Sequence, residues 1–255
     1  MIFFPTRKKI DTQNMLCYDN IANEYDDDTH TTCRNFEYFT SEVLNYFFTS
    51  CEIKENMKYL DIGVGTGKTL EVKLDNNITV VEFLEKKRCI IDVLDISEKM
   101  IQVTKRKFNN KINNYIQKSI FDFKPENKYD IIIAALCDPF LTRDFIKVAS
   151  DILKINGYLV LIFPSLSWAK QVRSNCSITK TIFNSLEGER HIGFSFCWDE
   201  NNLWRYLKKN GFYNKTLTKY YLKELGGNNS MSKINEGIFS INKNARFCTT
   251  IISRK

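Results

Sequence analysis

Residues 59–70, "YLDIGVGTGKTL", contain the turn that decides the fold. A short apolar run ends at Asp61 and is followed by glycine at every second position, Gly63, Gly65 and Gly67. Glycines let the backbone turn sharply out of a strand and approach a bound molecule closely. This stretch therefore predicts a strand, a ligand-binding turn and the start of a helix.

Around this turn, apolar runs alternate with segments of helical periodicity. Runs such as "YDIIIAAL" are continuously apolar, which is typical of central parallel strands that are covered on both faces. The alternation predicts an α/β fold with right-handed crossovers, and we expect the last two strands to pair as an antiparallel hairpin at one edge. The expected strands are 57–63, 88–97, 113–120, 129–137, 157–165, 212–225 and 245–255, and the expected helices are 68–87, 98–109, 141–154 and 199–211.

Two regions lie outside this alternation. From about residue 12 to residue 50 the apolar spacing is helical, and we expect residues 1–50 to form an N-terminal helical cap on a core of residues 51–255. Across residues 166–198 the regular pattern lapses, with aromatic, charged and turn-forming residues mixed together. We expect this stretch to be an insertion after the fifth strand.

Composition and charge argue against several classes of protein. The 37 Lys and Arg and 30 Asp and Glu residues give a formal net charge of +7 and are scattered, which favours a solvated surface over a basic groove. The eight cysteines lack the spacing of the usual zinc sites, so we expect reduced thiols and no metal. No window has the length of a signal-peptide core or a membrane span, so a soluble cytoplasmic protein is expected.

The glycine turn is similar to two nucleotide-binding loops without matching either. A P-loop needs glycine where this chain has Ile62, so "GVGTGKT" is one residue too short. Asp138 could still imitate the magnesium-holding acid of a nucleotide triphosphatase. A dinucleotide fingerprint needs glycine at the position of Lys68, which makes a nicotinamide cofactor a weak alternative.

The segment "LDIGVGTG" resembles motif I of the class I S-adenosylmethionine-dependent methyltransferases, in which an acid at the strand end precedes Gly-x-Gly-x-Gly. The resemblance extends over roughly residues 18–165 and implies a Rossmann-like, mostly parallel sheet of seven strands with an antiparallel last strand and helices on both faces. It also implies S-adenosylmethionine as cofactor and S-adenosylhomocysteine as product. A cofactor with an ammonium and a sulfonium group suits a close glycine backbone and the Asp61 carboxylate, although such glycines also occur in any tight strand-to-helix turn.

Further matches follow in the family's order. Asp95, at the end of "IIDVLDIS", resembles the acid that accepts both ribose hydroxyls, although Asp-x-Ser-Glu is also a common helix start. "YIQKSIFDF" lies where the family places its adenine-contacting segment, with Ser119 at the position of the usual acid and Asp122 three residues on. "YDNIANEYD" resembles the helix that covers the cofactor, and its tyrosines also suit core packing. The resemblance assigns cofactor binding to Tyr18, Tyr25, Asp61, Gly63, Gly65, Gly67, Asp95, Ile96, Met100, Ser119, Ile120 and Phe121.

For catalysis, the resemblance places the acceptor near the end of the fourth strand, beneath a lid formed by residues 166–198. Asp138 in "ALCDPFL" is the candidate base or acceptor-orienting group, with helix capping as its alternative role. His191 in "GERHIGFSF" is the candidate base from the lid, with packing as its alternative role. In-line methyl transfer can gain much of its rate from alignment, so a base is optional.

The acceptor that the sequence favours is a small molecule that is methylated on oxygen or nitrogen, as in secondary metabolism. A single proline follows Asp138, whereas members that methylate nucleic-acid amino groups carry two, and no aromatic-basic repeat for stacking bases is present. We therefore expect neither nucleic acid nor membrane as a partner, and a monomer or homodimer. The alternatives are an RNA or protein methyltransferase and a noncatalytic cofactor-binding member.

Overall fold

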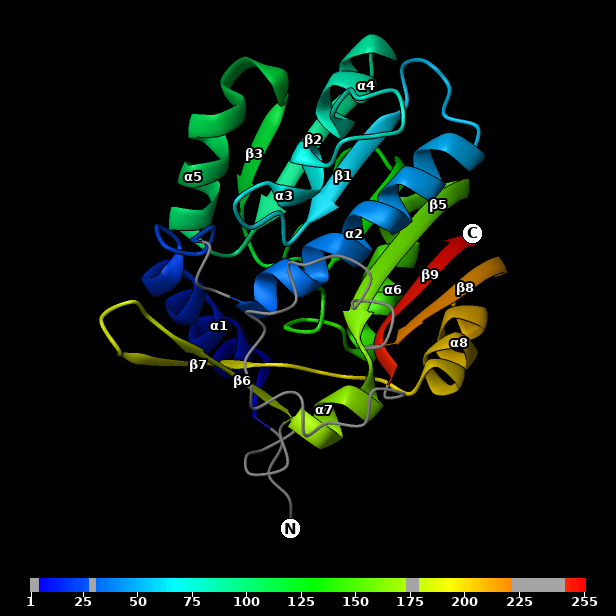
Figure 1. Cartoon of the computed structure of the whole chain (residues 1–255). Coiled ribbons are helices and arrows are strands. Elements are labelled where there is room, and N and C mark those ends of the chain that lie inside the picture. The colour runs from blue at the N-terminus through cyan, green and yellow to red at the C-terminus, as the bar shows by residue number, and fades with distance from the viewer. Residues whose placement is uncertain (1–4, 28–30, 173–178, 222–245) are drawn as a thin grey trace.

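A sheet of seven strands forms the centre of the molecule (Figure 1). The computed structural model describes residues 5–27, 31–172, 179–221 and 246–255. The strands of the sheet are β1 (Lys58–Ile62), β2 (Ile90–Asp95), β3 (Asn114–Gln117), β4 (Tyr129–Ala135), β5 (Leu153–Pro164), β8 (Tyr213–Tyr221) and β9 (Arg246–Arg254). Their order is β3-β2-β1-β4-β5-β9-β8, and β9 runs antiparallel to both of its neighbours while β1 to β5 pair in parallel. The expected α/β fold, with a mostly parallel sheet and an antiparallel last strand, is confirmed.

Helices cover both faces of the sheet. They are α2 (Thr31–Ser50), α3 (Lys68–Glu71), α4 (Val80–Lys86), α5 (Glu98–Phe108), α6 (Arg143–Ile152) and α8 (Glu200–Lys209). Side chains of α2, α4 and α5 share one core with Tyr59, Ile131 and Ile133, whereas α6 and α8 share a second core with Leu60 and Ile132. Residues 131–134 of β4 therefore enter opposite cores in alternation and are buried, which explains the continuous apolar run.

Residues 68–87, which are largely helical in composition, form the two short helices α3 and α4 with a turn between them. Between them the chain turns back, with an antiparallel bridge between Lys73 and Thr79 and a left-handed φ of 61° at Asn77. Asparagine tolerates that conformation better than most residues. Thr79 then begins α4 with a capping box, since its hydroxyl accepts from Glu82 N and the Glu82 side chain accepts from Thr79 N. The asparagine turn and the cap together interrupt the helix.

The N-terminal helix α1 (Arg7–Ile21) begins earlier than the sequence pattern indicates. Thr6 caps it by accepting a hydrogen bond from Lys9 N, so the helix starts before residue 12. The helix lies beyond the carboxyl ends of the parallel strands (Figure 1). That side of an open α/β sheet is where ligands bind, so α1 covers the expected location of the site.

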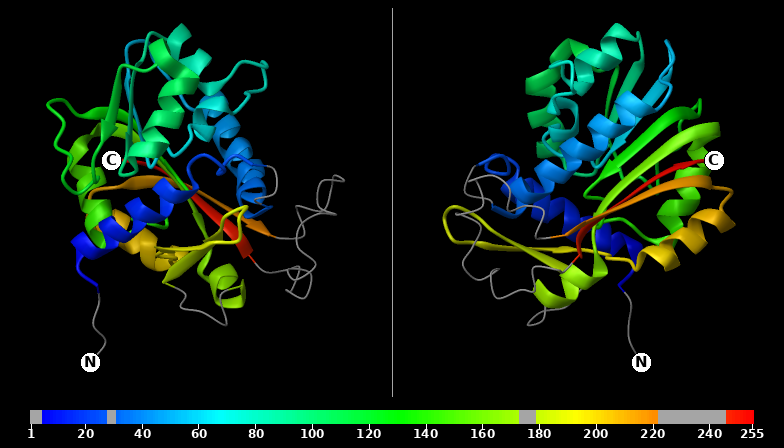
Figure 2. Two further views of the ribbon diagram at one scale, coloured as in Figure 1. Left: turned by 90° about the vertical axis from the view of Figure 1, so that its left-hand side faces the viewer. Right: turned by 45° about the vertical axis from the view of Figure 1, so that its right-hand side comes forward.

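The stretch 166–198 contains regular structure that its sequence pattern does not predict. α7 (Leu166–Val172) is followed by the antiparallel strands β6 (Lys180–Asn184) and β7 (Arg190–Phe194), and residues 173–178 lie outside the described residues. This hairpin lies beside α1 in both views of Figure 2. Gln13 Nε2 on α1 donates to Ile192 O at 3.0 Å, so the helix supplies a hydrogen-bond donor to β7.

Neither a membrane span nor a metal site is present in the described ranges. No helix there is long and apolar enough to cross a bilayer, and no three His, Cys, Asp or Glu side chains are grouped as metal ligands. Burial raises the pKa of the Cys17 thiol to about 12, so it stays a protonated, apolar group. The described thiols are those of Cys17, Cys51, Cys89, Cys137 and Cys197, and the side chains of Cys33, Cys176 and Cys248 lie outside the described part.

Candidate active site

A cavity of about 600 Å³ opens at the carboxyl ends of the parallel strands, among α1, α2 and the loops that follow β1 to β4. Neither Asp138 nor His191 lines it, and of the predicted cofactor residues Asp61 and Gly67 do not. The predicted residues that do line it are Tyr18, Tyr25, Gly63, Gly65, Asp95, Ile96, Met100, Ser119, Ile120 and Phe121. The structure thus brings together in one wall side chains from α1 to the end of β3.

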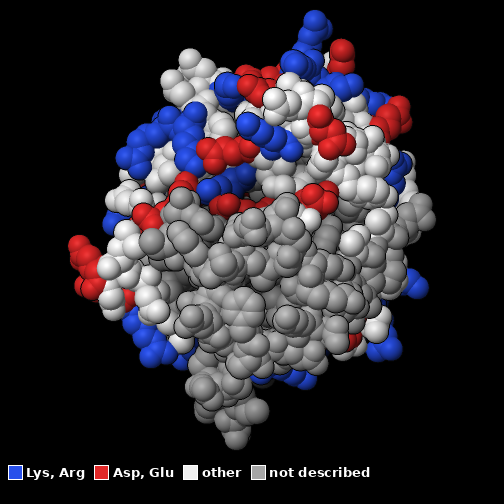
Figure 3. Space-filling view, in the orientation of Figure 1, with Lys and Arg blue, Asp and Glu red and all other residues white. Residues whose placement is uncertain are grey.

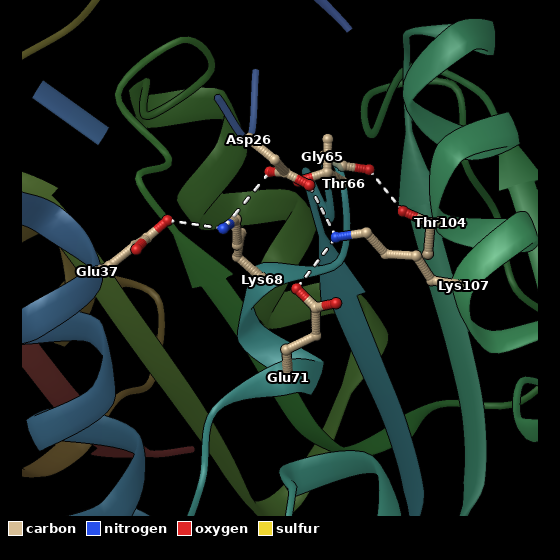
Figure 4. A network of polar contacts seen from close by, with 8 residues as sticks. All are labelled: Asp26, Glu37, Gly65, Thr66, Lys68, Glu71, Thr104 and Lys107. Atoms are coloured by element: carbon tan, nitrogen blue, oxygen red, sulfur yellow. Dashed lines mark hydrogen bonds and ion pairs between the residues drawn. The ribbon is translucent and has the colours of Figure 1, made fainter. Parts of the chain in front are cut away.

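The loop of residues 63–67, which follows β1, is fixed by hydrogen bonds on both sides. Gly63 N donates to Leu94 O at 2.8 Å, and Thr104 Oγ1 donates to Gly65 O at 2.6 Å (Figure 4). Gly65 has a φ of +55°, and a Cβ atom there would meet no atom within 4 Å, so this residue faces open space in the cavity wall. The loop therefore offers rigid backbone to a ligand at close range.

Asp95 ends β2 with its carboxylate at the cavity. Its Oδ2 accepts from Gly65 N at 2.9 Å and its Oδ1 accepts from Ser97 N at 2.8 Å. Burial raises the pKa of Asp95 to about 6, and these backbone hydrogen bonds limit the rise. Each oxygen keeps a further lone pair, so the carboxylate can still accept from two ligand hydroxyls. Ser97 caps α5 by accepting from Met100 N at 3.1 Å, which leaves Asp95 available for the ligand.

Asp61 lies behind the glycine loop and is fully buried. Its Oδ2 accepts a hydrogen bond from Thr69 Oγ1, and its Oδ1 has no partner in bonding geometry among the described residues, although the Tyr59 hydroxyl lies close enough to lower the pKa of Asp61. Burial raises the pKa of Asp61 to about 7, the Thr69 hydrogen bond opposes the rise, and the Asp95 carboxylate adds to it. A buried carboxylate with an unsatisfied oxygen favours a cationic ligand nearby, because the cation offsets the cost of the ionised form.

The segment after β3 contributes apolar side chains and a hydroxyl to the cavity wall, and α1 adds a carboxylate beside them. Ile120 is buried and Phe121 is half-buried in the cavity wall. Ser119 Oγ donates to Asp11 Oδ2 at 2.7 Å, and Asp11 also lines the cavity. Burial raises the pKa of Asp11. Nothing in the sequence around β3 indicates Asp11, because Asp11 and Ser119 are 108 residues apart in the chain.

Tyr18 and Tyr25 form an aromatic group with Phe183 of the hairpin. The ring centroids lie 6.3 Å apart for the two tyrosines, 5.6 Å for Tyr18 and Phe183, and 6.3 Å for Tyr25 and Phe183. Met100 is buried against the same group. Both tyrosines also line the cavity, so packing and ligand contact are compatible at these positions.

A charged network joins the turn after α1 to the glycine loop (Figure 4). Asp26 accepts from Thr66 Oγ1 at 2.6 Å and from Lys107 Nζ at 2.7 Å. Lys68 Nζ lies 2.9 Å from Glu37 Oε1 and 3.7 Å from Asp26 Oδ1. The Lys68 ammonium thus neutralises two carboxylates, unlike the lysine of a P-loop, which contacts phosphate.

Asp138 is buried beside the cavity and contacts the end of the insertion. Its carboxylate accepts a hydrogen bond from Ser195 Oγ, and its carbonyl accepts from Phe196 N at 2.7 Å. The hydroxyl of Thr142, and not Asp138, caps α6. The structure therefore joins Asp138 to the segment after β7 and does not place it in the cavity wall.

His191 is separated from the cavity. It lines a second hollow of about 650 Å³ between α1 and β7, together with Lys8, Lys9 and Arg190. Its Nδ1 lies 3.5 Å from Asn20 Nδ2. Its cross-strand partner Phe183 packs against Tyr18 and Tyr25, whereas His191 itself lines the second hollow and not the cavity.

The cavity wall suits a ligand with a nucleoside and positive charge. Gly65 leaves room for close approach, Asp95 can accept ribose hydroxyls, and the unsatisfied Oδ1 of Asp61 favours a cation. Apolar side chains at the end of β3 suit a planar base. The donor set therefore fits the cofactor that the glycine motif implies.

Residues 53–219 match a family model described as a methyltransferase domain. A comparison with curated proteins finds no match. This family model covers more than half of the chain, including the strands whose ends form the cavity, and therefore establishes the family of the chain.

Solved structures with the same fold include three methyltransferase-related examples. DhpI in complex with SAM and HEP is 14% identical over 98% of this chain and 100% of its own, with a TM-score of 0.63. An S-adenosylmethionine-dependent methyltransferase from Clostridium acetobutylicum is 15% identical, with coverages of 93% and 98% and a TM-score of 0.56. Phosphoethanolamine N-methyltransferase 2 from Haemonchus contortus, in complex with phosphomonomethylethanolamine and S-adenosylhomocysteine, is 13% identical with a TM-score of 0.59; 84% of this chain spans 52% of that protein. At these identities the likeness establishes the fold.

Proposed function

The chain belongs to the class I S-adenosylmethionine-dependent methyltransferases, and from this premise we propose that it methylates oxygen or nitrogen on a small-molecule acceptor. The observation that carries the proposal is the cavity of about 600 Å³, which α1 covers at the carboxyl ends of the strands. This volume lies within the range of roughly 300 to 1,000 Å³ that small-molecule sites occupy. A covered cavity of this size admits a small acceptor more readily than a folded macromolecule.

S-adenosylmethionine supplies an electrophilic methyl group on a sulfonium, and the protein's part is to hold and align the reactants. In the proposal, Asp95 accepts from the ribose hydroxyls and Gly63 and Gly65 provide close backbone. Asp61 supplies negative charge behind the loop without direct contact. Gly67 begins α3 and preserves the shape of the loop.

The acceptor would lie between the loop after β4 and the aromatic group of α1. Pro139 and Phe140 line the cavity, as do Tyr18 and Tyr25. A Cβ atom at Gly63 would approach the Phe140 ring to 2.7 Å, so this aromatic side chain packs directly on the glycine loop. Such a site aligns an acceptor by contact with rings and excludes water, which is the main requirement of an in-line displacement.

In this proposal residues 1–50 form the cap over the cofactor and residues 166–198 form the lid beside the acceptor, around the core of residues 51–255. Asp138 acts as a positioning residue, because its carboxylate contacts Ser195 after the hairpin. His191 takes no part in proton transfer, because it lines the second hollow. Deprotonation of the acceptor is left to solvent or to the acceptor's own acidity.

The charge on one described part of the surface favours the small-molecule proposal over an RNA methyltransferase. In the described part of the face shown in Figure 3, Lys and Arg side chains are interspersed with Asp and Glu. Recognition of a nucleic-acid backbone requires a concentrated positive patch. The mixed charge therefore supports the small-molecule alternative.

The test of the proposal is product mass after incubation of the protein with S-adenosylmethionine and panels of small phenols, carboxylic acids and amines. Phosphomonomethylethanolamine, which is bound in the Haemonchus contortus structure, serves as one amine probe. We expect a product heavier by one methyl group with a small molecule. Transfer only to RNA or protein would support the alternative acceptors, and binding of the cofactor without transfer to any class would support a noncatalytic member.

A further inference from the structure

The carboxylate of Asp11 lies in the cavity wall beside the end of β3, at a position that the sequence leaves without an acid. Ser119 Oγ donates to Asp11 Oδ2 at 2.7 Å, and both residues are half-buried. In the ranges that the structure describes, this hydroxyl is the one hydrogen-bond donor to the Asp11 side chain. Oδ1 is therefore left as an acceptor for a ligand.

Asp11 lies near apolar side chains of the cavity wall and near the Arg7 guanidinium, whose charge opposes the rise in the pKa of Asp11. Ile96, Ile120 and Phe121 line the same end of the cavity. The Arg7 guanidinium stacks over the Phe121 ring at 4.1 Å and also pairs with Asp144 of α6. Arg7 thus fixes the aromatic ring while its hydrogen bond goes to another carboxylate.

Asp122 is the other acid near this end, and it does not fill the same role. Its side chain is exposed and does not line the cavity. Burial raises the pKa of Asp11 most, the Ser119 hydrogen bond lowers it, and the charge of Asp122 raises it further. A planar ligand group that lies between these apolar side chains would therefore have Asp11, and not Asp122, at the edge of its ring.

We propose that Asp11 accepts a hydrogen bond from the exocyclic amine of the cofactor's adenine and thereby selects adenine over 6-oxopurines, an inference that rests on the proposed function. A carboxylate only accepts hydrogen bonds, so it pairs with an amino group and repels a carbonyl. The acid comes from α1 and not from the segment after β3, which carries Ser119. The N-terminal helix therefore determines base specificity as well as covering the cavity.

The experiment is calorimetric titration of the whole chain with S-adenosylhomocysteine and with S-inosylhomocysteine, in which a 6-oxo group replaces the amine. The wild-type protein should bind the adenine compound about tenfold tighter or more, since a site built for a donor rejects an analogue that lacks it. Asp11→Asn should reduce this preference about tenfold, because a carboxamide can donate to the carbonyl.

Asp144→Asn is the matched control. It removes the charge that pairs with Arg7 of α1, and the Asp144 side chain does not line the cavity. It should keep the wild-type preference. The comparison of two ligands separates base recognition from a general loosening of α1, which weakens both equally. An unchanged preference in Asp11→Asn, or equal loss of both ligands, would overturn the assignment. Failure of the wild-type protein to bind S-adenosylhomocysteine would instead refute the proposed cofactor.

Discussion

Asn14 and Phe194 are joined by a hydrogen bond of 2.6 Å, from the Phe194 N–H to Asn14 Oδ1, across 180 residues of sequence. The other end of the same carboxamide, Nδ2, donates to Pro139 O at 2.9 Å, and Asn14 is only 5% exposed. One side chain of α1 therefore holds the loop after β4 and the end of the hairpin together. These are the elements that the proposal places around the acceptor.

Asn14→Ala should reduce the free energy of unfolding by about 1–3 kcal/mol, because it leaves a buried N–H and a buried carbonyl unpaired. It should raise KM for the acceptor more than Kd for the cofactor, since the loosened elements lie on the acceptor side. Urea denaturation and steady-state kinetics measure the two effects. Thr12→Ala, at an exposed position of the same helix, is the control, and equal effects of both variants would contradict this role.

Asp26→Asn should weaken cofactor binding modestly, by about two- to fivefold, because partly exposed ion pairs contribute little individually. The substitution removes the charge that Lys68 and Lys107 share and loosens the turn after α1. Calorimetry at about 50 and 500 mM salt measures the effect, which should shrink at high salt because ions screen the pairs. Glu98→Gln, on the exposed face of α5, is the control. A difference that persists undiminished at high salt argues against an electrostatic link.

Cofactor affinity should rise with pH between about 6 and 8. Burial places the pKa of Asp61 at about 7, and a cationic cofactor favours the ionised carboxylate. At pH 6 most Asp61 carboxyls are protonated and must lose the proton before they attract the cation, whereas at pH 8 most are already ionised. Binding at pH 8 should therefore be roughly tenfold tighter than at pH 6. Asp61→Asn should flatten the profile. A wild-type profile that is already flat would contradict the electrostatic role of Asp61.

Asp138→Asn and Ser195→Ala should both lower turnover and leave cofactor affinity nearly unchanged. Each variant disturbs the same hydrogen bond between the loop after β4 and the segment after the hairpin. If Asp138 positions the lid, the pH profile of turnover keeps its shape in both variants. Loss of a basic group from the profile in Asp138→Asn alone would identify Asp138 as a base. His191→Ala should have no effect on turnover, and a large effect there would place the acceptor nearer to the second hollow.

Local sequence was sufficient for the sheet and for the floor of the site. The strands β1, β2, β4 and β5 can be recognised from their apolar runs, which are buried in the structure. The glycine loop directly follows β1, and Asp95 is the last residue of β2. Local sequence does not reveal the roles of Asp11, Asn14 and Asp26, because their hydrogen-bond partners lie between 40 and 180 residues away in the chain. Long-range packing, and not local pattern, brings α1 to the cavity.

The insertion shows the same limit for secondary structure. β6 and β7 form a two-stranded hairpin that packs on α1, so their stability depends on a contact far away in the chain. The position of His191 in this insertion indicates a place in the lid, whereas in the structure His191 lines the second hollow. Position in the chain indicated the element, while the direction of the side chain depended on how the hairpin docks.

The most direct test of the account is calorimetric titration with S-adenosylmethionine and S-adenosylhomocysteine, with ATP and NAD as controls, on the wild-type protein and on Asp95→Ala. We predict that the first two ligands bind and the controls do not. Loss of the charge-assisted contacts in Asp95→Ala should weaken binding by about 2 kcal/mol or more. Binding of ATP alone, or unchanged affinity in Asp95→Ala, would contradict the account.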